Sequence, residues 1–281
     1  MNEKITVYSP STRDNKNLFS ILQEAFLDIK KYKWQIILSI KKEIKSTYQQ
    51  DTFALFWAII MPIIPMTVYM ILAHIKVFNA VENMPFVFYI AVGMFTWLLM
   101  SSIIRKVLLS IKKEKAILRT TDFPILVSMM SQLGEVLNES FIRIFAVIAI
   151  VVWYQLDISF LSLILVLLSF IPIIIISFAI GIIVAILDML IQDTRRIVDI
   201  FLRYGLFISS VIIPFPQTGI LGAVNEFNIF NTYVVAIRDL LFFGEMSNFS
   251  LFIYTSSIGL ILFLVAMKLL YKMDYKIRDY L

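Results

Sequence analysis

Cysteine is absent from this 281-residue sequence, histidine occurs once, and glycine and proline occur only 8 times each. Without cysteine the chain has no disulfide framework and no thiol nucleophile, and a single histidine, His74, cannot complete a Cys/His metal site within one chain. The GxxxxGK[ST], HExxH and GxSxG patterns are also missing. The sequence therefore carries no recognisable site for nucleotide hydrolysis, metalloprotease or serine-hydrolase chemistry.

Charged residues are scarce as well. They make up 16% of the chain, whereas hydrophobic residues make up 60%. A soluble domain has about 25% charged and about 45–50% apolar residues, so the composition excludes a mainly water-soluble protein and indicates an integral membrane protein. The 25 Lys and Arg against 20 Asp and Glu give a net charge of +5. In a membrane protein this excess belongs to the cytoplasmic loops and is not a nucleic-acid signal.

Six apolar runs have about the length of a membrane-spanning helix, which needs roughly 20 mostly apolar residues. They cover residues 53–77, 86–109, 125–153, 160–187, 197–213 and 249–270. Pro62, Pro65 and Pro172 lie inside two of these runs, and a bilayer helix tolerates them because neighbouring helices bind the freed carbonyls. We therefore predict an all-α integral membrane protein with six transmembrane helices.

Lysine and arginine lie mostly on one side of these runs. They gather before the first run, between the second and third, between the fourth and fifth, and in the C-terminal tail, while the other side has only Lys76 and Arg238. By the positive-inside rule, both termini are cytoplasmic, and we expect a multi-pass protein of the cytoplasmic (inner) membrane. The first 50 residues show no cleavable signal peptide, so we expect the first span itself to target the chain.

Residues 1–52 are predicted as a cytoplasmic or interfacial segment in front of a membrane domain of residues 53–281. Apolar residues recur in this segment at helical spacing, with lysines around them; they include Leu18, Ile21, Leu22, Ala25, Phe26, Ile29, Trp34, Ile37, Ile40, Ile44 and Tyr48. Such a basic helix favours the headgroup layer, and we predict an amphipathic interfacial helix. The alternative is a small helical hairpin packed under the membrane domain.

Three ionisable residues of the third run, Glu135, Glu139 and Arg143, are spaced four apart and share one helical face. Glu139 precedes Arg143 in the favourable order for an ion pair one turn apart. An ionisable residue within a span is a functional candidate by default. Two interpretations are open: a polar stripe that faces a water-filled path, or a structural ion pair that fixes helix packing.

Charged residues also cluster between the fourth and fifth runs, at Asp188, Asp193, Arg195, Arg196, Asp199 and Arg203. This cytoplasmic turn either receives force from a cytoplasmic partner or is an ordinary solvated turn. For His74, near the outer end of the first run, we favour a position at headgroup level over a ligand role.

Residues 214–248 are too polar to span a membrane and too apolar for a simple loop. We predict that they dip into the outer leaflet as one or two short re-entrant helices. Irregular backbone at that depth is found only where it is buried in protein or lines a cavity, so the segment is a candidate outer gate of a pathway. The alternative is a lid that covers helix ends.

Six short motifs occur in order along these segments. They are the run from Tyr48 to Ala58 followed by Pro62, Gly93 to Trp97, Asp122-Phe123-Pro124, Gly134 to Leu137 with Arg143, Gln192 to Arg196, and Asn228 with Arg238-Asp239. Together they resemble the membrane-spanning permease subunits of type-2 ABC exporters for cell-surface polysaccharides, which export O-antigen, capsule and teichoic acid. The resemblance covers nearly the whole chain.

The resemblance implies half of a membrane pore. Two copies of the chain would pair as a homodimer, and each would contact one cytoplasmic ABC ATPase subunit, which binds the ATP and Mg²⁺. The chain itself would hold no cofactor and would not be an enzyme. The substrate would be a lipid-linked glycan or polyol-phosphate polymer moving outward, with no nucleic acid involved.

The resemblance also assigns roles to residues. Coupling to the ATPase is expected in the connection that contains Lys112, Lys113, Lys115, Arg119, Asp122, Phe123 and Pro124. The cytoplasmic turn is expected at Asp193 and Arg196, and the outer gate at Asn228, Arg238 and Asp239. Aromatic faces stack on sugar rings, so Trp57 and Trp97 are candidate channel aromatics.

Two alternative functions remain. The first is a type-2 ABC permease for a drug or a glycolipid. The second is a membrane enzyme acting on lipid-linked sugars, which would need a carboxylate or metal cluster at headgroup level. No DxxD or HxxxH pair lies on a predicted span, and this favours a transport subunit.

Overall fold

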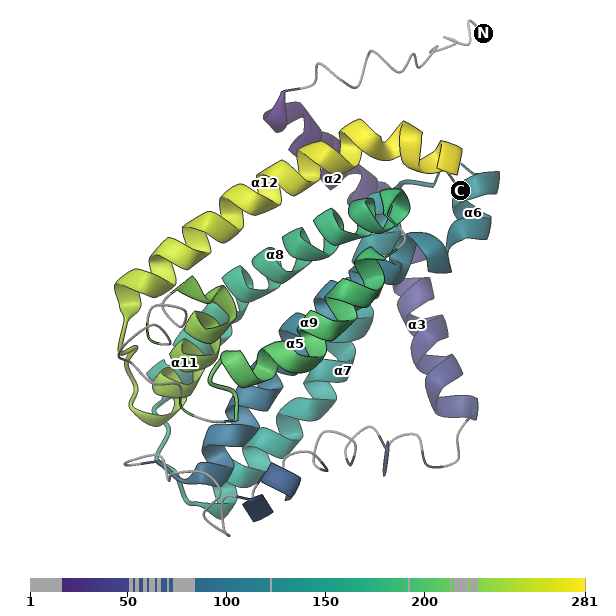
Figure 1. Ribbon diagram of the computed structural model, residues 1–281. Helices are drawn as coiled ribbons and strands as arrows, with labels where there is room; N and C mark the ends of the chain where they lie inside the picture. Colours follow the sequence, from purple (N-terminus) through teal and green to yellow (C-terminus); the bar gives the residue numbers. More distant parts are fainter. Residues whose placement is uncertain are drawn as a thin grey trace, which may run out of the picture.

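The computed structural model describes residues 17–50, 84–121, 123–191, 193–212, 214, 222 and 227–280, and ten further residues between 53 and 72. Positions 47–50, 275 and 280 are described by their backbone alone. Within these residues the regular elements are helices, and no strand is present (Figure 1). The helices are α2 (Leu18–Lys31), α3 (Lys33–Gln50), α5 (Phe86–Lys113), α6 (Lys115–Thr120), α7 (Ile125–Trp153), α8 (Phe160–Leu190), α9 (Thr194–Ile208), α11 (Ile229–Phe242) and α12 (Phe249–Tyr280).

Four helices are long and apolar enough to cross a membrane: α5, α7, α8 and the Phe249–Asp274 part of α12. The shortest of these stretches has 26 residues. At 1.5 Å per residue it is about 39 Å long, which exceeds the roughly 30 Å of a hydrocarbon core. The predicted runs 86–109, 125–153, 160–187 and 249–270 lie on these four helices.

The other two predicted spans, 53–77 and 197–213, do not correspond to long helices among the described residues. Most of the run 53–77 lies outside the described residues. The run 197–213 falls on α9, which has 15 residues and a length of about 22 Å, less than a spanning helix needs. The segment 214–248 contains α11, while residues 215–221 and 223–226 lie outside the description. The described residues thus provide four long apolar helices for the six expected spans.

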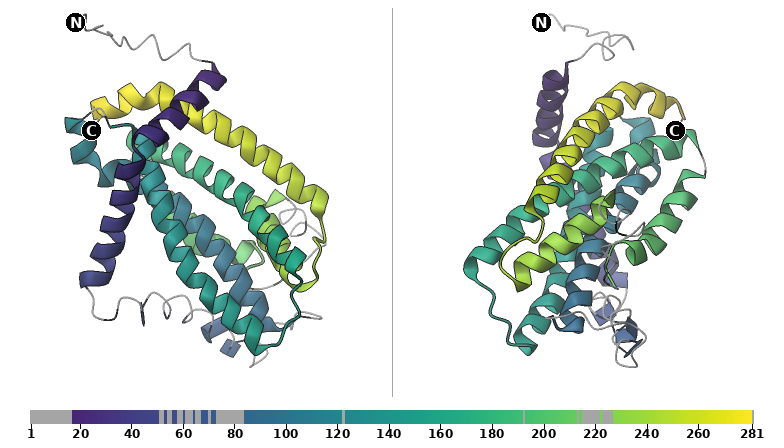
Figure 2. Two further views of the ribbon diagram at one scale, coloured as in Figure 1. Left: turned by 180° about the vertical axis from the view of Figure 1, so that it is seen from behind. Right: turned by 60° about the vertical axis from the view of Figure 1, so that its left-hand side comes forward.

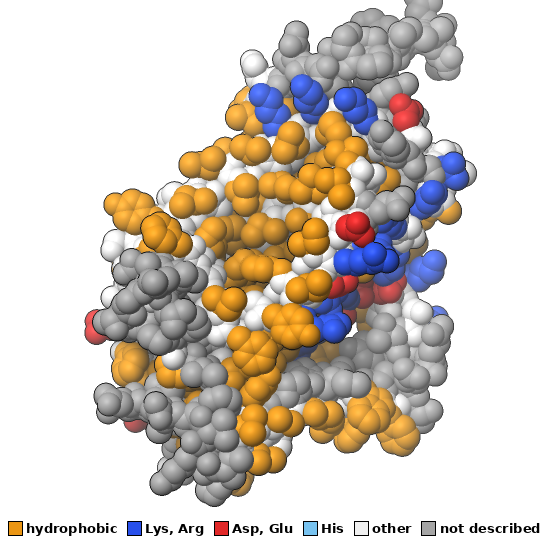
Figure 3. Space-filling model, viewed as in Figure 1, with side chains coloured by type: hydrophobic (Ala, Val, Ile, Leu, Met, Phe, Trp, Pro, Cys, Tyr) orange, Lys and Arg blue, Asp and Glu red, His pale blue; other side chains and the backbone are white. Residues whose placement is uncertain are grey.

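Helix α5 is the centre of the bundle. It packs against α7, α8, α9 and α11, and its side chains from Phe88 to Trp97 are buried. The contact with α8 is close, because a Cβ added at Gly181 would lie 2.8 Å from the Cβ of Val107. The outer helices keep large apolar side chains exposed, for example Phe145 and Ile261. Apolar side chains cover the middle of the face seen in Figure 3, and Lys and Arg gather along its upper and right-hand margins, as expected of a surface in contact with lipid.

The N-terminal segment forms two helices instead of the single interfacial helix that we expected. The helices divide at Tyr32, whose backbone leaves the helical conformation. Helix α2 crosses α12, where the Tyr271 hydroxyl donates to Asp28 at 3.0 Å, and α3 packs against α7 (Figure 2). The two helices have different main partners, α12 for α2 and α7 for α3, although α2 also contacts α7.

Candidate functional site

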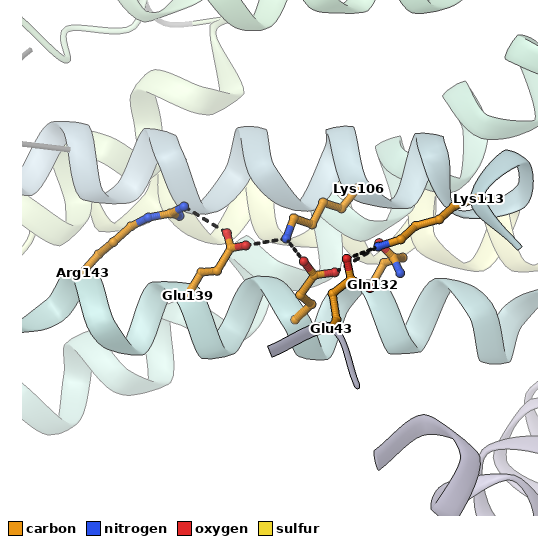
Figure 4. Close-up of polar contacts among 7 residues, drawn as sticks. Glu43, Lys106, Lys113, Gln132, Glu139 and Arg143 are labelled. Carbon is orange, nitrogen blue, oxygen red and sulfur yellow. Dashed lines mark hydrogen bonds and ion pairs between the residues drawn. The ribbon is translucent and has the colours of Figure 1, made fainter. Parts of the chain in front are cut away.

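A line of polar side chains joins α5, α7 and α3 (Figure 4). We call it the polar seam, and it consists of Glu43 on α3, Lys106 and Lys113 on α5, and Gln132, Glu135, Glu139 and Arg143 on α7. Spacings of three, four and seven place the α5 and α7 members on the facing sides of two helices. The seam therefore contains all three residues of the predicted intramembrane stripe.

Lys106 is the link between the two long helices. Its ammonium group donates to Glu135 and, at 2.5 Å, to Glu139. Glu139 also pairs with Arg143, one turn further along α7, at 3.0 Å. The predicted i,i+4 geometry is thus present, and Glu139 has a second cationic partner on another helix.

Helix α3 joins the seam through Glu43. Lys113 lies 2.7 Å from Glu43, 3.6 Å from Glu135, and donates to Gln132 at 3.4 Å. Just beside this pair, Ile40 lies against Gly134, where an added Cβ would collide with the isoleucine side chain. A glycine and an ion pair together allow α3 to approach α7.

The seam is electrically balanced, with three cations (Lys106, Lys113, Arg143) and three carboxylates (Glu43, Glu135, Glu139). A buried charge is costly unless it is paired, and pairing across helices is how this cost is met in a membrane. Two buried atoms of the seam lack a hydrogen-bond partner, Oε2 of Glu135 and Nη1 of Arg143.

The expected coupling residues separate into two groups. Lys112 and Lys113 form ion pairs inside the chain, Lys112 with the buried Asp188 at 2.6 Å. Lys115 and Arg119 are exposed on α6. Asp122 lies outside the described residues. Lys112 and Lys113 are exposed too, but their ammonium groups are engaged within the chain, whereas Lys115 and Arg119 form no ion pair with another described residue.

Phe123 and Pro124 belong to the junction between α6 and α7, which is fixed from the far end of the chain. Arg278 of α12 donates to the carbonyls of Leu118, Thr121 and Phe123 at 3.0, 3.1 and 2.6 Å. These carbonyls lie at the end of α6 and in the following turn, where intrahelical partners are lacking. One guanidinium thus satisfies three carbonyls and holds α6 in place.

The predicted cytoplasmic turn is built around Asp188. Its side chain is buried between Lys112 and Arg195, with Arg195 at 3.8 Å. Nearby, Arg105 pairs with Asp199 at 3.1 Å and joins α5 to α9. The two residues that the sequence singled out, Asp193 and Arg196, pair with each other at 3.1 Å and are largely exposed.

The three outer-gate residues connect α9, α11 and α12. Asn228 caps α11 by accepting from the backbone N–H groups of Phe230 and Asn231, and it donates to the carbonyl of Ile208 at the end of α9. Asp239 accepts from the N–H of Ser247, just before α12, at 3.2 Å.

Arg238 is buried beside α5. It donates to the carbonyl of Ser210 at 3.0 Å, and its guanidinium lies 3.4 Å from the ring centroid of Tyr89. Burial lowers the pKa of the Arg238 guanidinium, and the neighbouring Tyr89 and Asp239 oppose that shift. The charged arginine is therefore stabilised by a cation–π contact and by the adjacent carboxylate.

The two candidate channel aromatics differ in exposure. Trp57 is exposed, whereas Trp97 is only 2% exposed. The Trp97 indole donates to the carbonyl of Leu202 at 3.3 Å, and its ring packs on Phe230. In this chain Trp97 fills the space beside Gly205 of α9, so its ring is not at a surface where a sugar would stack.

Sequence reasoning missed Lys106, Glu43, Tyr89 and Arg278 as partners in these clusters. A signal for Lys106 was present: it is a lysine within an apolar run, two helical turns before Lys113, opposite a run with acidic residues at matching spacing. The partners of Arg278 are about 155–160 residues away in the chain, and no local spacing points to them.

Among the residues that the structure describes, no group of three or more His, Cys, Asp or Glu side chains is arranged to hold a metal ion. The arrangement instead provides paired charges that link helices. Comparison with protein-family models gives no match, and comparison of the sequence with curated proteins gives no match either.

Proposed function

We propose that this chain is the transmembrane permease subunit of an ATP-driven ABC exporter that moves a lipid-linked polysaccharide across the cytoplasmic membrane. The observation that carries the proposal is the order of the six sequence motifs. Gly93–Trp97 lies in the first half of α5, Phe123 and Pro124 directly precede α7, and Asn228 caps α11. Glu135 and Glu139 of α7 face Lys106 of α5. Four long apolar helices support the membrane location.

Helix α6 supports a coupling role. It is a short helix between two long apolar ones, it presents Lys115 and Arg119 to the outside, and Arg278 clamps it to α12. Because α6 is fixed to α12, a displacement of α6 would also move α12 and the neighbouring ends of α5 and α7. We propose that an ABC ATPase subunit docks on α6 and supplies ATP hydrolysis, for which this chain has no phosphate-binding motif.

The assembly that we propose contains two copies of this chain and two ATPase subunits. Each copy would have six spans, formed by the four long helices, the segment 53–77 and α9 with its continuation. Both termini would be cytoplasmic, and α11 would belong to a re-entrant outer gate. The polar seam would hold α5, α7 and α3 together during the cycle.

The test is co-expression with a candidate ABC ATPase from the same genome, followed by purification through a tag on the permease alone. We expect the ATPase to co-purify and the pair to restore surface polysaccharide in a strain lacking both genes. Lys115→Gln with Arg119→Gln should reduce ATPase recovery, whereas Lys268→Gln with Lys276→Gln, the same charge change on α12, should not. Recovery of drug resistance without surface glycan would instead favour a drug permease.

A further inference from the structure

Acidic and basic side chains of α2 and α3 point in opposite directions. The acidic residues of these two helices are Glu24, Asp28 and Glu43. Asp28 accepts from Tyr271 of α12, Glu43 pairs with Lys113 of α5, and Glu24 is partly buried one turn before Asp28. All three carboxylates are engaged on the protein side.

The lysines of the same helices are directed outward. They are Lys30, Lys31, Lys33, Lys41, Lys42 and Lys45, all exposed, and no ion pair joins any of them to another described residue. Because Asp28 and Glu43 are turned toward the bundle, the outer surface of α2 and α3 carries lysine charges that no other described residue pairs with. Figure 2 shows both helices on the outside of the bundle, with α3 along its flank.

Large apolar side chains share this surface. Trp34 and Leu38, 69% and 67% exposed, lie on the same face of α3 as Lys41 and Lys45, since the spacings are four, seven and eleven. On α2, Phe19 and Phe26 are likewise exposed. The ammonium group of Lys33 lies 5.5 Å from the centroid of the Trp34 ring, so the cation and the indole lie side by side on the surface.

This combination fits one environment. Bulk water would leave the tryptophan and leucine unfavourably exposed, and hydrocarbon would strand the lysine charges. The headgroup layer accepts both, because indole rings and snorkelling lysines are favourable there. The Glu43–Lys113 pair holds the lysines of α3 beside the last residue of α5, where that apolar helix ends.

We propose that the outer surface of α2 and α3 binds the anionic headgroups of phospholipids in the membrane in which the chain resides. The phosphodiester groups of anionic lipids such as phosphatidylglycerol supply the negative charge that pairs with the lysines. The acyl chains of the same lipids contact Trp34, Leu38 and Phe26. This surface goes beyond the proposed transport function, since it concerns the resident lipid and not the exported molecule. An acidic protein would neutralise the lysines but would have to cover the exposed tryptophan as well.

The absence of cysteine from the sequence permits a clean test. Leu38→Cys of the full chain is labelled with a fluorophore and placed in nanodiscs of phosphatidylglycerol and phosphatidylcholine, with brominated acyl chains on either lipid at equal mole fraction. A lysine beside an anionic surface changes partitioning about fivefold, so we expect brominated phosphatidylglycerol to quench about two- to fivefold more strongly. Raising NaCl to about 0.5 M should remove the difference, because the Debye length then falls to about 4 Å.

Two controls keep the result specific. A label at Val152→Cys, exposed at the far end of α7, should be quenched equally by both lipids. Lys41→Gln with Lys42→Gln and Lys45→Gln should abolish the difference at position 38, whereas Lys115→Gln with Arg119→Gln and Arg196→Gln, the same loss of three exposed charges, should preserve it. Each variant is first checked for an unchanged unfolding temperature.

Equal quenching at position 38, or a preference that survives loss of the three lysines, would overturn the proposal. Equal quenching that becomes unequal only after a high-salt wash has removed a bound acidic soluble protein, and low salt has been restored, would assign the surface to that protein instead. These outcomes are independent of the export assay, because neither ATPase nor glycan is present.

Discussion

Arg238 and Tyr89 donate to the same acceptor, the carbonyl of Ser210, at 3.0 and 2.8 Å, while the guanidinium stacks on the tyrosine ring. Ser210 has a left-handed backbone conformation, with φ of 48°, two residues after the end of α9. The two side chains come from α11 and α5. Three helices are therefore joined at one carbonyl, and a residue that sequence motifs assign to a gate is a structural connector here.

Arg238→Lys should be clearly destabilising. Lysine keeps the charge but loses the planar fork and the stacking surface, so we expect a loss of about 1–3 kcal/mol. Tyr89→Phe removes one hydrogen bond and should cost about 1 kcal/mol. Thermal unfolding in detergent measures both, with the exposed Arg196→Lys as the control. An unfolding temperature for Arg238→Lys equal to that of the parent would show that the fork is dispensable.

Lys106 is expected to be the most sensitive member of the polar seam. Lys106→Met leaves Glu135 and Glu139 facing each other with weaker compensation, and the cost should be on the order of 1–3 kcal/mol. Adding Glu139→Gln removes one of the stranded charges and should recover part of the loss, because residues in contact are not additive. The unfolding temperatures of the two single variants and the double variant in nanodiscs give a double-mutant cycle. Strictly additive losses would show that Lys106 and Glu139 do not interact.

Removing Arg143 should destabilise the protein less than removing Glu139. Glu139 still has Lys106 when Arg143→Ala is made, whereas Glu139→Ala leaves the largely buried Arg143 without its carboxylate. We therefore expect Glu139→Ala to lower the unfolding temperature more than Arg143→Ala, with partial recovery in the double variant. The reverse order would indicate that Arg143 has a further partner, such as the transported molecule.

Two glycines offer a matched comparison. In Gly181→Ala the new methyl group meets the Cβ of Val107, which cannot move without the backbone of α5, so the helices must separate. In Gly134→Ala the obstacle is the end of the flexible Ile40 side chain, which can rotate. Alanine also gains about 1 kcal/mol of helix propensity. We expect Gly181→Ala to lower the unfolding temperature and Gly134→Ala to leave it near the parent value; equal effects would refute the packing argument.

Arg278→Ala should loosen the junction between α6 and α7. Three carbonyls lose their donor, and hydrogen exchange of peptides covering residues 115–124 should accelerate about tenfold for each 1.4 kcal/mol of lost protection. The neighbouring exposed Lys276→Ala is the control. If export is assayed in parallel, Arg278→Ala should uncouple ATP hydrolysis from transport while both subunits still co-purify. Unchanged exchange would mean that α6 is held by other contacts.

The length and apolarity of the runs were enough to predict α5, α7, α8 and α12, because a long apolar stretch leaves few other structures open to it in a membrane. The face shared by Glu135, Glu139 and Arg143 was also predictable, since helical spacing is local. The break at Tyr32 was not, because it accompanies long-range packing, mainly of α2 on α12 and of α3 on α7, which no local spacing reveals. Trp97 shows the same limit: only the approach of Gly205 decides that the ring is interior and not channel-lining.

The hydrogen bonds of Arg278 have a consequence for the order in which the protein is made. The carbonyl of Phe123 leaves the ribosome 155 residues before the guanidinium that binds it. At 5–20 residues per second this interval is roughly 8–30 s. During that time α7 and α8 are made and can join α5 in the membrane, while the α6 turn still lacks its donor. The turn therefore reaches its final hydrogen bonding only after α12 has been made.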